Sequence, residues 1–346
     1  MNPIRVNADY ESVLFLNQPA PPIVNQSLEF LAFYLDERPV LTPKKYSNEY
    51  LSHIEKLTGR EVRLVSHGDS VNWWGELKNI PLEQLLNSKI TSTQLLIEQG
   101  WVKDLLVIES IENLKTLNRD KIWLLKNPYL MSGQKFYTLF PNEELKENSI
   151  SLPVIAEPLL ERCFDFSHYF FSDGRSICYE NLVDSRFQYK GSKFSGSYSL
   201  ESLSFYHQIN PNLWEEFQDR LIKITTYYRD LGATNFSVDS FVYKINGELF
   251  IYPMCEVNAR RTMGSCAFEI FNKFKSTANF GAIYLNKSNG ESFESLKEIE
   301  HAEKGIIALS PGDTRFNIFL VLAENQTELQ NKINLIQAWP RLDKRR

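Results

Sequence analysis

The dipeptide Asn246-Gly247 is the sequence feature that most constrains how this chain folds, because it separates two largely apolar segments. A type I′ turn requires a positive φ at both central residues, and Asn followed by Gly tolerates this well. The stretch from Ala233 to Gly264 is therefore predicted to form a two-stranded hairpin, with Ile245 opposite Glu248. Counting outward predicts three more facing pairs: Tyr243 with Phe250, Phe241 with Tyr252, and Asp239 with Met254.

One face of this predicted hairpin carries polar and apolar side chains together. Facing residues of an antiparallel pair share a face, so Asp239, Glu256 and Asn258 are expected to project together. The register makes the two carboxylates diagonal neighbours, about 7 to 8 Å apart at Cα. The same face carries four large apolar side chains: Phe241, Phe250, Tyr252 and Met254.

Such a face is either solvated or half buried. In the half-buried case, unpaired carboxylates are costly and are usually neutralised by a metal ion or a basic partner. Two acids and an amide supply the oxygen ligands that divalent cations prefer. Arg260 and Arg261 follow directly, and a planar guanidinium suits a phosphate or a carboxylate.

The composition is ordinary for a soluble globular protein, with 43% hydrophobic and 23% charged residues among 346. That length allows two or three subdomains. The net charge of −5 and the lack of a long basic run argue against nucleic acid as a partner. No apolar run approaches the roughly 20 residues of a membrane helix, and no signal peptide is evident. Four cysteines without CxxC spacing indicate neither a zinc site nor a disulfide framework, which favours the cytoplasm.

The first part of the chain is predicted to form a small open α/β domain with βαβαβ order. The strands are expected at 12–16, 40–41 and 61–65, and the helices at 26–34 and 47–57. No GxGxxG or P-loop pattern interrupts this region, which argues against dinucleotide and Walker-type sites. Trp73 and Trp74 cannot both face one core, so one of them either lines a ligand pocket or packs between domains.

Lys126 ends a predicted strand at 121–125 and precedes a loop that contains Ser132-Gly133 and leads to a second strand at 135–140. A lysine at a strand end is well placed to contact phosphates, although it can equally be an ordinary surface lysine.

Further along, residues 153–171 are predicted to form a strand, a turn that holds Glu157, Glu161 and Asp165, and a second strand. Acids in a turn usually face solvent. Residues 186–204 combine three cations with glycines and serines, and we expect a mobile basic loop there.

A helix from Pro211, capped by Asn210 and ended by Gly232, is predicted to lead into the Asp239 strand. A helix at 266–274, a strand at 315–323 and a helix at 326–336 are expected to complete the chain.

The blocks Val238-Asp239 and Glu256-Val-Asn258-Ala-Arg260-Arg-Thr-Met-Gly264 resemble the C-terminal metal signature of ATP-grasp enzymes. The strand-end lysine, the acidic hinge and the helix into Asp239 stand in the order of that family. The resemblance covers roughly residues 87–264. The loop after Lys126 has one glycine where the family has a glycine-rich loop, which departs from the pattern.

The resemblance implies an α/β (α+β) fold. A small N-terminal pre-ATP-grasp domain (1–86) would precede a two-part ATP-grasp domain with antiparallel sheets, whose small lobe spans 87–160 and whose large lobe spans 161–346. It implies ATP and Mg²⁺ as cofactors. Small carboxylates and amines, such as amino acids or peptides, would be the substrates, with a homodimer as one option.

The resemblance also assigns roles to residues. Asp239, Glu256 and Asn258 would hold magnesium, and Lys126 would contact the α- and β-phosphates, with Lys89 at the helix start that enters the ATP domain. The remaining assignments are these: Glu157 at the adenine, Asp165 or Glu161 at the ribose, Arg186, Lys190 and Lys193 over the γ-phosphate or acyl phosphate, and Arg260, with Arg261 as its substitute, at the substrate carboxylate.

The implied reaction is ATP-dependent ligation of a carboxylate to an amine through an acyl phosphate. A phosphotransferase on the same scaffold is one alternative. A non-catalytic nucleotide-binding or interaction protein is the other, and the glycine-poor loop keeps it open.

Overall fold

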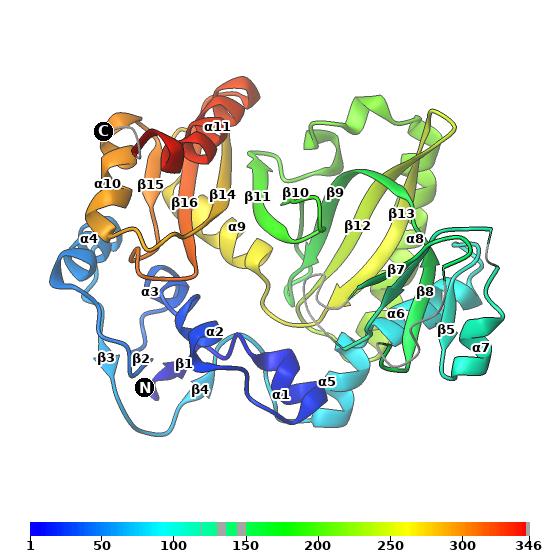
Figure 1. Cartoon of the computed structure of the whole chain (residues 1–346). Coiled ribbons are helices and arrows are strands. Elements are labelled where there is room, and N and C mark those ends of the chain that lie inside the picture. Colours follow the sequence, from blue (N-terminus) through cyan, green and yellow to red (C-terminus); the bar gives the residue numbers. More distant parts are fainter. Residues whose placement is uncertain (119, 130–135, 144–149, 344–346) are drawn as a thin grey trace.

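The computed structural model describes residues 1–118, 120–129, 136–143 and 150–343. These residues form three sheets in chain order, arranged as an arc around the middle of the molecule (Figure 1). The fold is mixed α/β with one parallel sheet and two antiparallel sheets, as expected. The division at residues 86 and 160 stays a prediction. Among the described residues, none of the helices combines the length and the apolar character needed to cross a membrane.

The first sheet has the order β3-β2-β1-β4 and is parallel. Its strands are short: β1 (Ile4–Arg5), β2 (Val40–Leu41), β3 (Leu64–Val65) and β4 (Val71–Asn72). Helix α4 (Asn48–Thr58) begins after Ser47, whose side chain accepts a hydrogen bond from the Tyr50 N–H, and ends at Gly59, which confirms that prediction.

The strand predicted at 12–16 is wrong, because these residues belong to helix α1 (Tyr10–Leu16). The central strand is instead β1, earlier in the chain. Tyr10 and Leu14 are buried four positions apart on one side of α1, the spacing of a helix face. A short apolar run does not distinguish a buried strand from a buried helix turn. The helix predicted at 26–34 is divided into α2 (Pro22–Gln26) and α3 (Leu31–Leu35).

The second sheet has the order β5-β8-β6-β7 and is antiparallel. Its strands are β5 (Leu106–Ile108), β6 (Trp123–Lys126), β7 (Tyr137–Leu139) and β8 (Val154–Pro158). Helices α6 (Lys89–Glu98) and α7 (Ile111–Lys115) pack against it, whereas α5 (Ile80–Asn87) contacts α1 and β13 (Glu248–Asn258). Lys126 ends β6 as predicted, whereas the Ser132-Gly133 loop lies outside the described residues.

The third sheet is antiparallel and has the order β13-β12-β9-β10-β11-β14-β16-β15. Its strands are β9 (Glu161–Phe170), β10 (Ser176–Val183), β11 (Tyr189–Ser195), β12 (Phe236–Ile245), β13 (Glu248–Asn258), β14 (Phe280–Lys287), β15 (Ile306–Ala308) and β16 (Phe316–Ala323). The helices of this part are α8 (Pro211–Asp230), α9 (Met263–Phe274), α10 (Phe293–Ala302) and α11 (Gln326–Asp343), with short 3-10 turns at Leu200–Ser202 and Tyr206–Gln208.

The predicted hairpin is β12–β13, and its turn residues Asn246 and Gly247 have φ values of 50° and 90°. The outer register is as predicted down to Phe241 opposite Tyr252. Beyond that pair the register shifts, and Asp239 faces Glu256 directly instead of Met254. The bulge adds two residues to β13, so the acids still share a face, but as direct partners and not as diagonal neighbours.

Two further predictions are corrected by the strands of this sheet. The turn between β8 and β9 is short, so Glu157 lies on β8, and Glu161 and Asp165 lie on β9. Residues 186–204 are no loop: they contain β11, which hydrogen-bonds to β10 on one side and to β14 on the other. Gly191, Ser192 and Ser195 are accommodated in β11 because the two neighbouring strands satisfy backbone groups there, whereas the other glycine and serines follow the strand.

Candidate functional site

A cavity of about 190 Å³ lies where the three parts of the chain meet, and we call it the central cavity. Strands β9, β10, β12 and β13 of the large sheet line it, together with Trp74 from the first part and Lys126 from the second. Seven predicted site residues line it: Lys89, Lys126, Asp165, Asp239, Glu256, Asn258 and Arg260.

The paired carboxylates Asp239 and Glu256 are held in different ways. Asp239 accepts hydrogen bonds from the Ser167 hydroxyl at 2.6 Å and from the Asn258 amide at 3.0 Å. Burial, followed by the negative charge of Glu256, raises the pKa of Asp239. Lys89 Nζ lies 2.7 Å from Glu256. Burial opposes ionisation of Glu256, but the positive charges of Lys89, Arg260 and Lys126 together outweigh it and lower the pKa of that carboxyl.

The chemistry of this donor set fits a divalent cation. Asp239 and Glu256 are facing residues on neighbouring strands, and burial together with the charge of Glu256 raises the pKa of Asp239, a penalty that a bound cation would relieve. In the described part of the chain, no three His, Cys, Asp or Glu side chains gather into a metal site. A cation here would therefore need the Asn258 oxygen and oxygens of a bound substrate as further ligands.

Lys126 and Glu157 form an ion pair in which both residues are buried. The Tyr252 hydroxyl donates a further hydrogen bond to Glu157 at 3.2 Å. A buried pair of this kind is costly to form and costly to break, so it fixes the position of the Lys126 ammonium at the cavity wall.

Asp165 also lines the central cavity, where it pairs with Arg162. The Arg162 guanidinium in turn lies over the Phe241 ring, at 4.1 Å from its centroid. The carboxylate is thus compensated and held against the aromatic wall of β12.

Arg260 connects the central cavity to the first part of the chain. Its guanidinium donates to the Asn258 side-chain oxygen at 2.9 Å and pairs with buried Glu11 of α1. The backbone N–H of Arg261 donates to the Trp74 carbonyl oxygen at 3.0 Å. The segment after β13 is therefore fixed by contacts to the first part of the chain.

No protein-family model and no curated protein matches the sequence. Solved structures with the same architecture do match. A solved structure of N5-carboxyaminoimidazole synthetase from Staphylococcus aureus, complexed with ADP, aligns at 14% identity over 91% of this chain and 94% of that chain, with a TM-score of 0.55. Carboxyaminoimidazole ribonucleotide synthase from Aspergillus clavatus, complexed with ATP, aligns at 13% identity over 83% and 78%, with a TM-score of 0.51. The chain has an ATP-grasp fold.

Within this ATP-grasp fold, four predicted site residues line other surfaces. Lys190 lies 3.5 Å from Asp184, and Arg186 is exposed in the turn between β10 and β11. Glu161 is exposed at the start of β9. Arg261 pairs with Glu269 at 2.7 Å and covers the Trp73 ring. The Arg261 side chain therefore has other partners than the Arg260 side chain, which contacts Asn258 and Glu11.

Lys193 is the fifth such residue. It projects from β11 to the face of the sheet away from the central cavity and donates to Gln330 of α11. Its assignment to the γ-phosphate depended on a loop that closes over the site, whereas Lys193 lies on a strand, β11, that pairs with β10 and β14.

Ser167 and Asn181 are cavity residues that the sequence did not reveal, and they join β9 and β10 to the acids. Asn181 donates to the Ser167 hydroxyl at 2.6 Å, and Ser167 donates to Asp239. The sequence shows which residues of a strand share a face, but it does not show that β9 and β10 lie next to β12 in the order β12-β9-β10. Glu11 was missed because it directly precedes residues 12–16, which were assigned to a strand although Glu11 and these residues form α1.

Proposed function

We propose that this protein is an ATP-dependent ligase that joins a small carboxylate to an amine, with ADP and phosphate as the other products. The observation that carries the proposal is the central cavity itself. It combines two facing carboxylates, an amide and four cationic side chains, Lys89, Lys126, Arg162 and Arg260, on an ATP-grasp fold. The relatives complexed with ADP and ATP support a nucleotide as ligand.

Lys126 would bind the α- and β-phosphates of ATP. Its ammonium is fixed by Glu157 at the cavity wall, so its positive charge requires little reorganisation when the triphosphate binds. Glu157 would lie on the adenine side, next to Tyr252. Asp165 would accept hydrogen bonds from the ribose hydroxyls, since vicinal hydroxyls offer two donors.

Asp239, Glu256 and Asn258 would hold Mg²⁺. When bound, the cation would supply charge neutralisation for the phosphate oxygens. The chain's own contribution is orientation: Ser167 and Asn258 hold the Asp239 carboxylate, and Lys89 keeps Glu256 ionised.

Arg260 would hold the substrate carboxylate. That carboxylate attacks the γ-phosphorus of ATP, ADP leaves, and an acyl phosphate forms; the amine then displaces phosphate and gives an amide. Glu11 and Asn258 fix the Arg260 guanidinium from two sides, which would position the carboxylate for attack. No side-chain nucleophile is required by this sequence of steps.

The experiment is a screen for ADP formation with purified protein, ATP, Mg²⁺ and a panel of amino acids and short peptides, followed by mass spectrometry of the products. The proposal predicts an amide in equal amount to ADP. A phosphorylated substrate in place of the amide would identify a phosphotransferase. ATP binding without turnover across the panel would favour a non-catalytic binding protein.

A further inference from the structure

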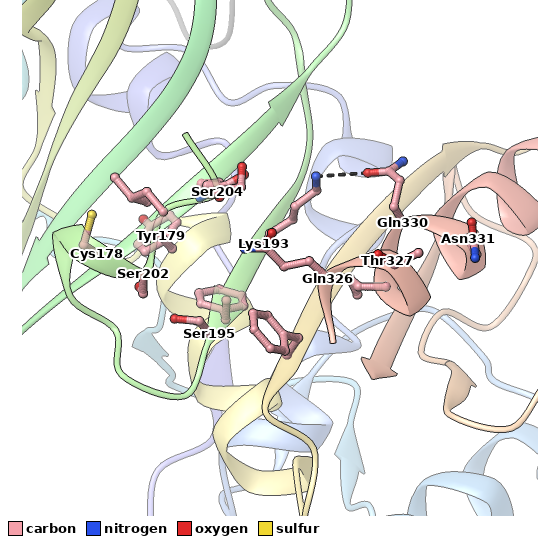
Figure 2. A pocket seen from close by; sticks show the side chains of 15 residues that line it. Cys178, Tyr179, Lys193, Ser195, Ser202, Ser204, Gln326, Thr327, Gln330 and Asn331 are labelled. Carbon is pink, nitrogen blue, oxygen red and sulfur yellow. Dashed lines mark hydrogen bonds between the residues drawn. The ribbon is translucent and has the colours of Figure 1, made fainter. Parts of the chain in front are cut away.

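A second cavity of about 410 Å³ lies behind the central cavity, and we call it the rear cavity. Strands β10 and β11 separate the two. Side chains alternate along β10: Asn181 and Val183 line the central cavity, whereas Cys178 and Glu180 line the rear cavity. The first turns of α11 close the other side of the rear cavity (Figure 2).

Glu180 and Lys193 face each other across β10 and β11 on the rear side. Opposite charges at facing positions usually contact one another and gain free energy by doing so. This pair is separated instead. The Glu180 carboxylate accepts the Ser204 backbone N–H, and the Lys193 ammonium turns to the Gln330 side-chain oxygen at 3.1 Å (Figure 2).

The two charged groups therefore do not pair with each other, although their strand positions face, and each is held by a neutral group. The Gln330 amide is itself oriented, because its nitrogen donates to Asn334 at 2.9 Å. The N-terminus of α11, where Gln326 and Thr327 line the cavity, adds to the positive charge of Lys193, since the helix dipole favours an anion there.

Besides these two charged residues, the rear cavity is lined by both apolar and polar side chains. Leu203, Phe280 and Leu329 provide apolar surface, and Ser195 and Ser202 provide hydroxyls. A volume of about 410 Å³ falls within the range of roughly 300 to 1,000 Å³ that is typical of small-molecule sites. A ligand that complements this lining carries two opposite charges and a partly apolar body.

We propose that the rear cavity binds a zwitterion, a free amino acid or a dipeptide, with its carboxylate at Lys193 and its ammonium at Glu180. A simple anion such as phosphate is attracted by Lys193 but repelled by the Glu180 carboxylate. A simple cation is attracted by Glu180 but repelled by Lys193. A zwitterion offers an ammonium to the Glu180 carboxylate and a carboxylate to the Lys193 ammonium, so each charged residue gains an opposite charge. This inference is independent of the reaction in the central cavity.

The test is calorimetric titration of the full chain with the proteinogenic amino acids and with dipeptides. The tightest ligand is then compared with its N-acetyl derivative, which lacks the positive charge, and with its amide, which lacks the negative charge. Each blocked form is expected to bind about tenfold to a hundredfold more weakly, the loss of one charged hydrogen bond. No binding by any amino acid or dipeptide overturns the proposal, as does equal binding of the blocked forms.

Variants locate the ligand. Glu180→Gln and Lys193→Gln should each weaken the unblocked ligand by a similar factor, whereas Asp239→Asn in the central cavity should leave its affinity unchanged. Melting temperatures equal to that of the parent protein show that the variants are folded. If Asp239→Asn abolishes binding while Glu180→Gln has no effect, the amino acid occupies the central cavity and the rear site is refuted.

Discussion

The hairpins β12–β13 and β10–β11 belong to one sheet and line the same central cavity, but they present opposite chemistry to it. β12–β13 carries the charged groups, Asp239 and Glu256, on its cavity face. β10–β11 presents neutral hydrogen-bonding groups there, among them Asn181 and Tyr179, and carries Glu180 and Lys193 on its rear face. One hairpin therefore supplies the ligand oxygens, and the other supports them.

This difference shows why the cations come from elsewhere in the chain. Facing carboxylates need positive charge close by. The basic residues of β11 are turned away or paired, so Lys89 from α6 and Arg260 beyond β13 supply it. The central cavity is thus assembled across sheets, and each contribution can be removed separately.

The largest expected effect is at the acids of β12–β13. Asp239→Asn and Glu256→Gln should each reduce ADP formation about a thousandfold, because a charged carboxylate ligand of the cation is replaced by a neutral amide. Asp239→Asn should also keep or raise the melting temperature, since it removes a charge that is disfavoured by burial and by Glu256. Kinetics and thermal unfolding check both. Activity within a few-fold of the parent would remove this hairpin from the site.

The next effect concerns the strand β11. Gly191 has a φ of 150°, and a Cβ placed there would lie 2.1 Å from the Ile283 carbonyl oxygen of β14. Gly191→Ala should therefore reduce the free energy of unfolding by about 2 to 4 kcal/mol, measured by denaturant titration.

Gly247→Ala in the turn of β12–β13 is the matched control. Gly247 has a φ of 90° and nothing within 4 Å of an added Cβ. Only backbone strain is introduced, so the cost should be about 1 kcal/mol. An equal loss in the free energy of unfolding for Gly191→Ala and Gly247→Ala would mean that β11 does not pack against β14 as described.

Lys126→Ala tests the nucleotide side of the central cavity. It should weaken ATP binding about tenfold to a hundredfold, because one charged contact to phosphate is lost. The change also leaves Glu157 buried without its partner, so a loss of stability is expected. The double variant with Glu157→Gln should recover stability but not affinity. If affinity recovers too, Lys126 acts only through Glu157.

The smallest effect is expected for Lys190→Ala, whose ammonium pairs with Asp184 at 3.5 Å and belongs to β10–β11. ADP formation should stay within about twofold of the parent, the usual result for an exposed ion pair. A loss comparable to that of Lys126→Ala would show that the β11 cations reach the phosphates after all.

Local chemistry made the hairpin β12–β13 predictable from sequence. Turn residues with positive φ fixed the loop, and strand alternation placed Asp239, Glu256 and Asn258 on one face. The bulge that brings the two acids directly opposite contains Pro253, a residue typical of bulges and edge strands, but the proline alone does not fix by how many residues the register shifts. The direct pairing is closer than the predicted diagonal one.

Long-range features were not predictable. That β11 lies between β10 and β14 is decided by strand order, which the composition of residues 186–204 does not encode. The pairing of Glu11 with Arg260 joins residues far apart in the chain. The sequence therefore revealed which residue types can act, but not which of them meet in the central cavity.

The most direct test of this account is calorimetric titration of ATP with and without Mg²⁺, for the parent protein and for Asp239→Asn. ATP binding should tighten with Mg²⁺ in the parent protein and lose that dependence in the variant. ATP affinity that is unaffected by both Mg²⁺ and the substitution would contradict the claim that the facing acids of β12–β13 hold a cation bound to the nucleotide.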